Sequence, residues 1–186
     1  RFEELAYLNK GLYIECIDER TSETHVFHAE GGIRQFVSDL NSGQQGIHPI
    51  IMAEGVVDNV AIDFALQYNA GYKETILTFA NNIHTKEGGT HLVGFKSGLT
   101  KTLNDYGKKA GIIKDADKKL SGEDVREGIT AVVSIKVEDP QFEGQTKAKL
   151  GTSEAKGAVE SVLSEYLTYF LEENPNIGKT IIEKGM

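Results

Sequence analysis

The sequence predicts a mixed α/β fold with a largely antiparallel sheet and a long helix near the C-terminus. Apolar side chains occupy every second position from Val60 to Tyr68, which is the period of a half-buried strand. From Ser153 to Glu173 apolar residues instead recur at helical spacing. The expected strands between residues 50 and 79 are joined by connections too short for a crossover helix, so we expect them to be antiparallel.

The N-terminal segment predicts a β-hairpin. Residues 12–18 alternate apolar and polar side chains, and 24–27 follow the turn-prone Asp18-Glu19-Arg20-Thr21-Ser22. Cys16 alternates with Leu12 and Ile14, so we expect it in the core rather than as a reactive thiol.

A short helix and three strands are expected next. Apolar residues from Ile33 to Leu40 have helical spacing, and Asn41-Ser42-Gly43 ends the helix. The strands are expected at 50–53, 60–68 and 75–79.

The second half predicts two helices, a strand and the long helix. An apolar stripe marks the first helix, with Thr90 as its expected cap, and consists of Leu92, Phe95, Leu99, Leu103 and Tyr106. A short helix begins at Ser121, and we interpret the carboxylates near Arg126 as a helix cap and a salt-bridged turn. The strand 129–137 alternates and ends before Pro140, and Asn174-Pro175 ends the long helix.

Composition favours one globular domain. The chain has 186 residues, of which 39% are hydrophobic and 26% charged. No run approaches the roughly 18 apolar residues of a membrane span, and the single cysteine agrees with a reducing compartment, so we expect a cytoplasmic protein. The opening at Arg1, without an initiating methionine, suggests a fragment of a longer chain.

Charge argues against a protein that coats nucleic acid over its whole surface, because the formal net charge is -8. Residues 86–114 run against this balance, with six lysines and two acidic residues. A local basic patch is therefore expected there.

Several catalytic patterns are excluded. Phe95 separates Gly94 from Lys96, which the phosphate-binding P-loop requires to be adjacent. No hydrolase signature is present, and His25 and His28 point to opposite faces of a strand, which disfavours a metal site. Gly88-Gly89 permits close approach of either a ligand or another backbone, and we favour tight packing.

The loop 141–151 leaves two alternatives open. Its sequence, QFEGQTKAKLG, contains glycines that free the backbone, an amide at Gln145, and two lysines that share a side if the segment is extended. Those lysines, Lys147 and Lys149, suit an anion, but a solvated connector has the same composition.

Five segments in the same order resemble the second, transducer domain of bacterial DNA gyrase B, a type IIA topoisomerase component. The resemblance extends from Arg1 to about Gly185, and "EGGTH" with "FEGQTK" is its most specific part. The corresponding protein of topoisomerase IV is the close paralogue and stays an alternative. The segments are "RFEELAYLNKGL", "FHAEGGIRQFVSDLN", "NNIHTKEGGTHLVGFKSGLTKTLN", "SGEDVREGITAVVSIKV" and "DPQFEGQTKAKLGTSEA".

The resemblance implies a mixed, largely antiparallel sheet with helices packed on one face, as in ribosomal-protein-domain-2-like folds and small-molecule kinases. It implies a transducer β/α domain at 1–152, then a long helix and linker at 153–186 toward a metal-binding cleavage domain. An ATP-binding domain would precede Arg1. In the family the matching loop reaches that ATP site, which implies that Lys147 contacts the γ-phosphate, that Gln145 lies beside it, and that both act in catalysis.

The resemblance also implies cofactors and partners. Gln145, Thr146 and Lys147 would bind ATP that is shared with the preceding domain, and Mg²⁺ would bind elsewhere in the full enzyme. Because water activation would fall to an acid outside this chain, we expect the isolated chain to be inactive. Partners would be DNA, gyrase A and a second copy of gyrase B in a heterotetramer, with Lys96 and Lys101 facing the DNA.

Without the resemblance, two other function classes remain. A stand-alone phosphotransfer enzyme would need a glycine- and serine-rich phosphate loop, which the sequence lacks. A structural or nucleic-acid-binding module remains an alternative, and salt-dependent DNA binding by the isolated chain would distinguish it.

Overall fold

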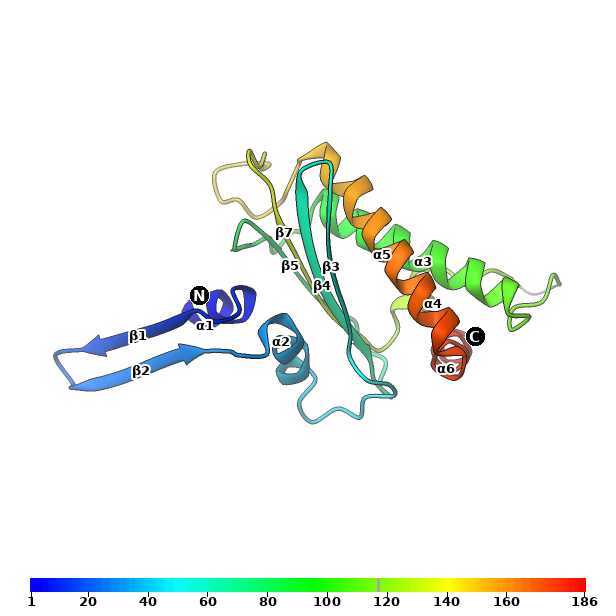
Figure 1. The fold of residues 1–186 in the computed structure, drawn as a ribbon, viewed down its shortest axis with the longest axis horizontal. Coiled ribbons are helices and arrows are strands. Elements are labelled where there is room, and N and C mark those ends of the chain that lie inside the picture. Colours follow the sequence, from blue (N-terminus) through cyan, green and yellow to red (C-terminus); the bar gives the residue numbers. More distant parts are fainter. Residues whose placement is uncertain (117) are drawn as a thin grey trace.

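The computed structural model describes residues 1–116 and 118–186 (Figure 1). Two sheets and several helices make up the fold, which confirms the mixed α/β class. In chain order the elements are α1 (Phe2–Leu8), β1 (Tyr13–Asp18), β2 (Glu23–His28), α2 (Gly32–Leu40), β3 (Ile51–Val57), β4 (Val60–Tyr68), β5 (Thr75–Ala80), β6 (Ile83–His84), α3 (Thr90–Lys109), α4 (Gly122–Arg126), β7 (Ile129–Lys136), α5 (Ser153–Glu173) and α6 (Pro175–Gly185).

The main sheet has the strand order β3-β4-β7-β5-β6. β3 and β4 form an antiparallel hairpin whose turn residues, Asp58 and Asn59, both have positive φ. β5 runs antiparallel to β4 in direction but does not lie beside it. β7 lies between them, antiparallel to β4 and parallel to β5. The alternating directions of β3, β4 and β5 agree with the expectation, while the last strand in the chain takes the central position between β4 and β5.

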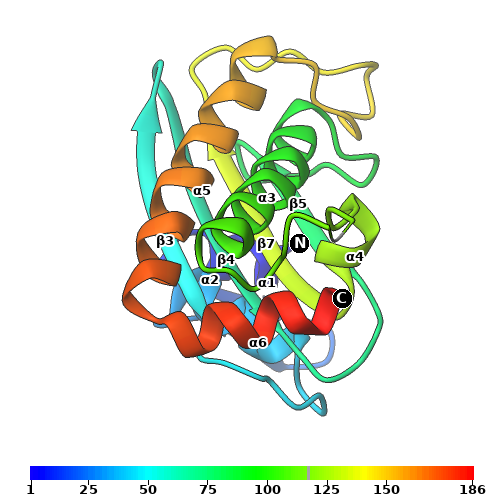
Figure 2. The same ribbon diagram turned by 90° about the vertical axis from the view of Figure 1, so that its right-hand side faces the viewer.

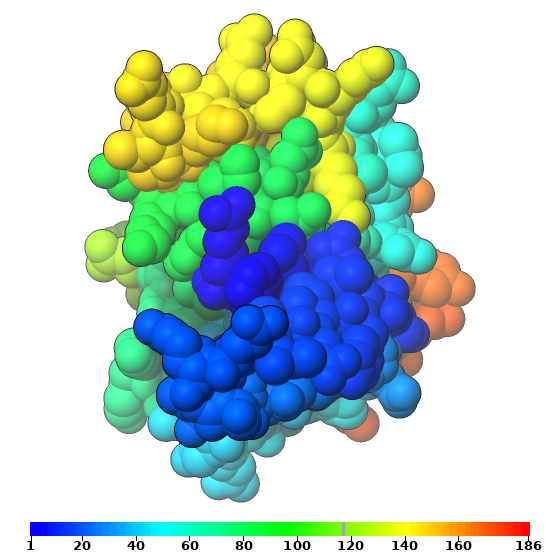
Figure 3. Space-filling view, turned by 90° about the vertical axis from the view of Figure 1, so that its left-hand side faces the viewer, coloured from blue at the N-terminus to red at the C-terminus, as the bar shows by residue number. Residues whose placement is uncertain are grey.

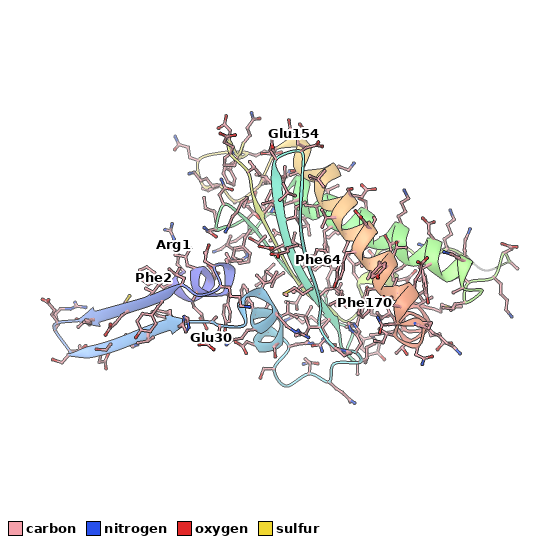
Figure 4. All side chains as sticks on the ribbon, in the orientation of Figure 1. Arg1, Phe2, Glu30, Phe64, Glu154 and Phe170 are labelled. Atoms are coloured by element: carbon pink, nitrogen blue, oxygen red, sulfur yellow. The ribbon has the colours of Figure 1, made fainter. Side chains whose placement is uncertain are left out.

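The two long helices cover one face of this sheet, as expected (Figure 2). α3 and α5 pack closely against each other because α3 carries glycines at the contact. A Cβ at Gly94 would lie 2.2 Å from the carbonyl oxygen of Lys156, and one at Gly98 would lie 3.3 Å from Glu160. Phe64 lies between β4 and these helices, with its ring 6.2 Å from that of Tyr166 on α5 (Figure 4).

The opposite face carries a second, smaller core under α1 and α2. Leu8, Ile33, Phe36 and Val37 pack there against side chains of β4, β5 and β7. The ring of Tyr7 stacks on that of Phe36 at 4.4 Å between centroids. The sequence pattern did not indicate which side chains pack together on this face. It also did not predict that residues 2–8 form a helix, α1.

The β1–β2 hairpin confirms the predicted hairpin but forms a sheet of its own. It projects from α1 and α2 away from the main sheet (Figure 1) and stands forward in the space-filling view from that side (Figure 3). Cys16 is only half-buried on this arm, so the expectation that it lies in the core was wrong. Alternation along a strand reveals two faces but not whether anything covers either one.

The C-terminal segment ends in a helix. α5 stops at Glu173, before Asn174-Pro175 as predicted, and Pro175 then occupies the first turn of α6. Ile181 and Ile182 are buried, and Gly178 lets α6 approach the ring of Tyr106. The division into 1–152 and 153–186 stays a prediction. Within the described residues, no helix is long and apolar enough to cross a membrane.

Candidate functional site

The loop after β7 presents Gln145, Thr146 and Lys147 at an exposed tip. The turn that forms the tip uses Gly144 at φ 95° and Lys147 at φ 54°, and the amide of Lys147 donates to the carbonyl of Gly144 at 3.3 Å. Because Lys147 adopts the left-handed conformation, the segment is not extended, and the alternation that would place both lysines on one side does not apply. The tip therefore presents one lysine rather than a pair.

The two lysines of the loop have different partners. Lys149 forms an ion pair with Glu143, with 3.1 Å between Nζ and Oε2. The ammonium of Lys147 lies over the ring of Phe142, 5.8 Å from its centroid. A cation–π contact at an exposed site is worth about 0.5–1 kcal/mol. Lys147 is thus held weakly and can be recruited by a stronger anionic partner, whereas Lys149 already faces a carboxylate in an exposed ion pair.

A short two-stranded base supports this tip. Phe142 pairs with Leu150, the amide of Glu143 donates to the carbonyl of Lys149 at 2.8 Å, and that of Gly151 donates to Gln141 at 2.7 Å. Leu150 is buried, which fixes the base in the core. The tip therefore projects from a rigid stem.

The segment before α3 is hydrogen-bonded to this stem. The amide of Glu87 donates to Ala148 at 2.9 Å, that of Leu150 to Gly88 at 3.0 Å, and that of Thr90 to Leu150 at 3.1 Å. Gly89 has φ 134°, and a Cβ there would lie 2.3 Å from the carbonyl oxygen of Leu150. The glycine pair thus serves close backbone approach, the alternative that the sequence favoured. We call residues 87–90 with 148–150 the loop clamp.

The side chain of Thr90 makes a hydrogen bond beside the clamp that the sequence did not predict. Its hydroxyl donates to the carbonyl of Thr152 at 2.6 Å, and Gly89, not Thr90, occupies the N-cap position of α3. The expected cap was therefore wrong. The hydroxyl instead joins the start of α3 to the start of α5.

His91 lies beneath the clamp, fully buried, with Nε2 2.9 Å from the hydroxyl of Thr85. Thr85 in turn exchanges hydrogen bonds with Thr78 on β5. Burial lowers the pKa of His91 to about 4, so the ring is neutral at physiological pH. Nδ1 has no hydrogen-bond partner among the described residues.

A basic groove runs along α3. Lys96 and Lys101 line one cavity of about 660 Å³ together with Lys119, Arg126 and Asp105. The structure therefore brings the two predicted lysines to one groove. Lys96 is not isolated there, because its Nζ lies 3.7 Å from Glu74, which also accepts from Nε of Arg126 at 3.1 Å.

Sequence reasoning missed two cations of this groove. Arg126 had been assigned to a local salt-bridged turn. That turn does contain the expected cap, since the amide of Asp124 donates to the hydroxyl of Ser121 at 3.1 Å. Arg126, however, pairs with Glu74, 52 positions away in sequence. Lys119 lies outside the lysine-rich segment 86–114, so no sequence signal marked it.

In the part of the chain that the structure describes, no three histidine, cysteine or acidic side chains lie close enough together to hold a metal ion. The described residues thus offer a cationic tip and a basic groove.

Comparison with known proteins gives the family. A sequence model of the family described as DNA gyrase B matches residues 32–186. The chain belongs to the DNA gyrase B family. The gyrase B protein of Clostridium acetobutylicum is 55% identical over 188 residues, which cover 100% of this chain and 30% of that relative. The gyrase B protein of Bacillus mycoides is 54% identical and is covered to 46%.

Solved structures agree with this family. The 43K ATPase domain of Thermus thermophilus gyrase B, in complex with an aminocoumarin, has a TM-score of 0.89 at 39% identity, over 99% of this chain and 50% of that one. The topoisomerase IV ATP-binding domain of Francisella tularensis has a TM-score of 0.83 at 25% identity, over 98% of this chain and 49% of that one. The chain therefore spans about half of each solved region and less than half of the curated relatives.

Proposed function

We propose that this chain is the transducer part of a gyrase B protein, where it completes the ATP site of a preceding domain. The observation that carries the proposal is the tip Gln145-Thr146-Lys147, exposed on a stem that the loop clamp fixes to α3. The loop lies at the end of the main sheet where β7 stops (Figure 1), so its tip is accessible to a nucleotide held by that domain.

Lys147 acts as the sensor of the γ-phosphate. A charge-assisted hydrogen bond to phosphate is worth about 1.5–3 kcal/mol, which exceeds the roughly 0.5–1 kcal/mol of its contact with Phe142. With ATP present the ammonium leaves the ring and binds phosphate, and the amide of Gln145 lies beside it. After hydrolysis and phosphate release, the contact with phosphate is lost, and the ammonium of Lys147 returns to the ring of Phe142.

The stem of the loop couples this change of partner at Lys147 to the rest of the chain. The loop continues from β7 and enters α5, and the clamp ties it to the start of α3. A force on Lys147 therefore reaches the central strand and both long helices. In this way the ATP cycle is coupled to movement of DNA through the enzyme, and to supercoiling.

The groove on α3 contacts the DNA backbone. Its four cations are Lys96 and Lys101 of α3, Lys119 of the segment before α4, and Arg126 at the end of α4. The proposed assembly contains gyrase A and a second copy of gyrase B, with ATP and Mg²⁺ bound mainly by parts of the protein outside these residues.

We place the chain with gyrase rather than topoisomerase IV because relatives named as gyrase B proteins match at 55% and 54% identity. Supercoiling of relaxed circular DNA by the full protein with gyrase A tests this choice. Decatenation without supercoiling would favour topoisomerase IV. Salt-dependent DNA binding by the 186-residue chain, without any effect on an ATPase, would favour the structural or nucleic-acid-binding module.

Lys147→Ala in the full protein tests the sensor. We expect ATP turnover to fall roughly ten- to hundredfold, the equivalent of about 1.5–3 kcal/mol. Lys149→Ala is the matched control, because Lys149 is paired with Glu143, and it should change turnover less than about threefold. The measurement is steady-state phosphate release with gyrase A and DNA.

Equal effects of the two substitutions would contradict the assignment of Lys147. The isolated 186-residue chain should show no ATP turnover in the same assay, and measurable turnover would show that the catalytic acid lies within it.

A further inference from the structure

The outer edge of β3 is unpaired in the part of the chain that the structure describes, because β3 is the first strand of the sheet and pairs only with β4. The type I′ turn at Asp58-Asn59 makes Val57 and Val60 exchange both backbone hydrogen bonds. Alternation then directs the N–H and C=O groups of Met52, Glu54 and Val56 away from β4. Three successive outward residues form a template for an added strand.

Two cavities border this edge, one on each face of the sheet. One of about 790 Å³ lies between Glu54–Val57 and α5, and one of about 700 Å³ lies between Met52–Glu54 and α1 with α2. Tyr166 of α5 lines both cavities. Figure 2 shows β3 at one side of the sheet with α5 crossing over it. An added strand would therefore find space for its side chains on both faces.

The surface beside the edge is apolar and acidic. Val56 is 71% exposed, Tyr169 61%, Met52 43% and Tyr166 40%. The linings of the two cavities contain five carboxylates, from Glu54, Asp63, Asp105, Glu165 and Glu172, and three lysines, Lys10, Lys101 and Lys136. Exposed apolar side chains next to an acidic excess complement a segment that is both apolar and basic.

A second copy of this chain fits this edge poorly. The antiparallel self-pairing that uses all three outward residues places Met52 opposite Val56 and Glu54 opposite its own copy. Like charges directly opposite each other destabilise a strand pair. The edge therefore favours a different, basic partner.

We propose that the free edge of β3 binds an extended basic peptide segment of another protein by strand addition. The segment's backbone bonds to Met52, Glu54 and Val56, while side chains on its two faces contact Tyr166 and the acidic cavity linings. Backbone bonds supply the pairing, and Glu54 with Glu165 selects lysine or arginine in the segment.

The probe is a short acetylated and amidated peptide of alternating lysine and valine, added to the ¹⁵N-labelled 186-residue chain. Amide hydrogen exchange at Met52, Glu54 and Val56 should slow roughly tenfold or more at saturating peptide. The amides of Ala53, Gly55 and Val57 already bond to β4 and should not change. The same peptide with alternate backbone amides N-methylated should not protect the edge.

Two variants sharpen the test. Glu54→Gln should weaken the peptide several-fold without changing exchange in the free chain. Val56→Pro removes an outward amide that β4 does not use, and should abolish protection while circular dichroism stays unchanged. If this variant fails to fold, Glu54→Gln and the N-methylated peptide still decide the matter.

Equal binding of the N-methylated peptide would overturn the proposal, since only charge would then be recognised. Protection of the three amides without peptide, together with a dimer in sedimentation equilibrium, would also overturn it in favour of a second copy.

Discussion

His91 is an ionisable residue that the fold buries completely. It lies in the first turn of α3, fully buried under the loop clamp, with one ring nitrogen bonded to Thr85 and the other without a partner among the described residues. Burial lowers the pKa of His91 from 6.5 in the unfolded chain to about 4. The folded state therefore excludes the proton that the unfolded state accepts.

Acid should consequently weaken the fold through His91. Its contribution is complete above pH 6.5 and is lost as the pH falls toward 4, because only the unfolded chain binds the proton in that range. Between pH 7 and 5 we expect a loss of about 2 kcal/mol in the free energy of unfolding. Urea unfolding of the 186-residue chain at the two pH values measures it.

His91→Gln, which does not titrate, is the control for this loss and should show a smaller difference between pH 7 and pH 5. His48 has a pKa lowered by burial as well, and it remains in both proteins, so its effect cancels in the comparison. An unchanged difference in the variant would rule out His91 as the source.

At the scale of elements, the loop clamp is a backbone interaction between two segments about 60 positions apart. It depends on Gly89, which has both a positive φ and no room for a Cβ beside Leu150. The clamp fixes where the tip begins, while the turn at Gly144 and Lys147 fixes which lysine is presented. The clamp thus determines where the cation lies, and the turn determines which lysine it is.

Gly89→Ala should destabilise the chain by roughly 3 kcal/mol or more, because it adds both backbone strain and a clash. Gly157→Ala is the matched control. Gly157 lies within α5 with nothing within 4 Å of an added Cβ, so the substitution should stabilise by roughly 0.5–1 kcal/mol. Urea unfolding at neutral pH measures both.

If Gly89→Ala cost no more than a few tenths of a kcal/mol, the clamp would not hold the loop as described. The same variant in the full protein should also lower ATP turnover, since Leu150 and the tip would shift together.

At the scale of the whole molecule, α3 connects the two candidate sites. It begins in the loop clamp and carries the basic groove along its length, while α5 packs beside it. The loop proposed to contact nucleotide and the groove proposed to contact DNA are therefore both linked to one helix. A chain with net charge -8 concentrates cations on that helix, which supports a local rather than general role in DNA contact.

Lys101→Glu in the full protein should reduce DNA-stimulated ATP turnover more than basal turnover, because it places a negative charge in the groove that we propose contacts DNA phosphates. Lys179→Glu makes the same charge change on α6, beside a different cavity, and should leave the stimulation within about twofold. Turnover is measured with and without linear DNA. Equal loss of basal and stimulated turnover would refute a role for Lys101 in DNA contact.

The sequence by itself determined the elements whose period is strong. The alternation of β4, the stripe of α3 and the end of α5 before Pro175 follow from local side-chain patterns, and the structure confirms them. The exposed tip Gln145-Thr146-Lys147 was also marked by its own residues, and the proposal that it contacts a nucleotide came from the family resemblance. These features depend on neighbours in the chain, which a sequence displays directly.

Only the tertiary structure decided which segments meet. It placed β7 between β4 and β5, turned Gly89 toward Leu150, paired Arg126 with Glu74, and left Cys16 half-covered on its arm. It also distinguished Lys147 from Lys149 through a single left-handed residue and a single ion pair. Such contacts join positions tens of residues apart, and no local period records the partner across the fold.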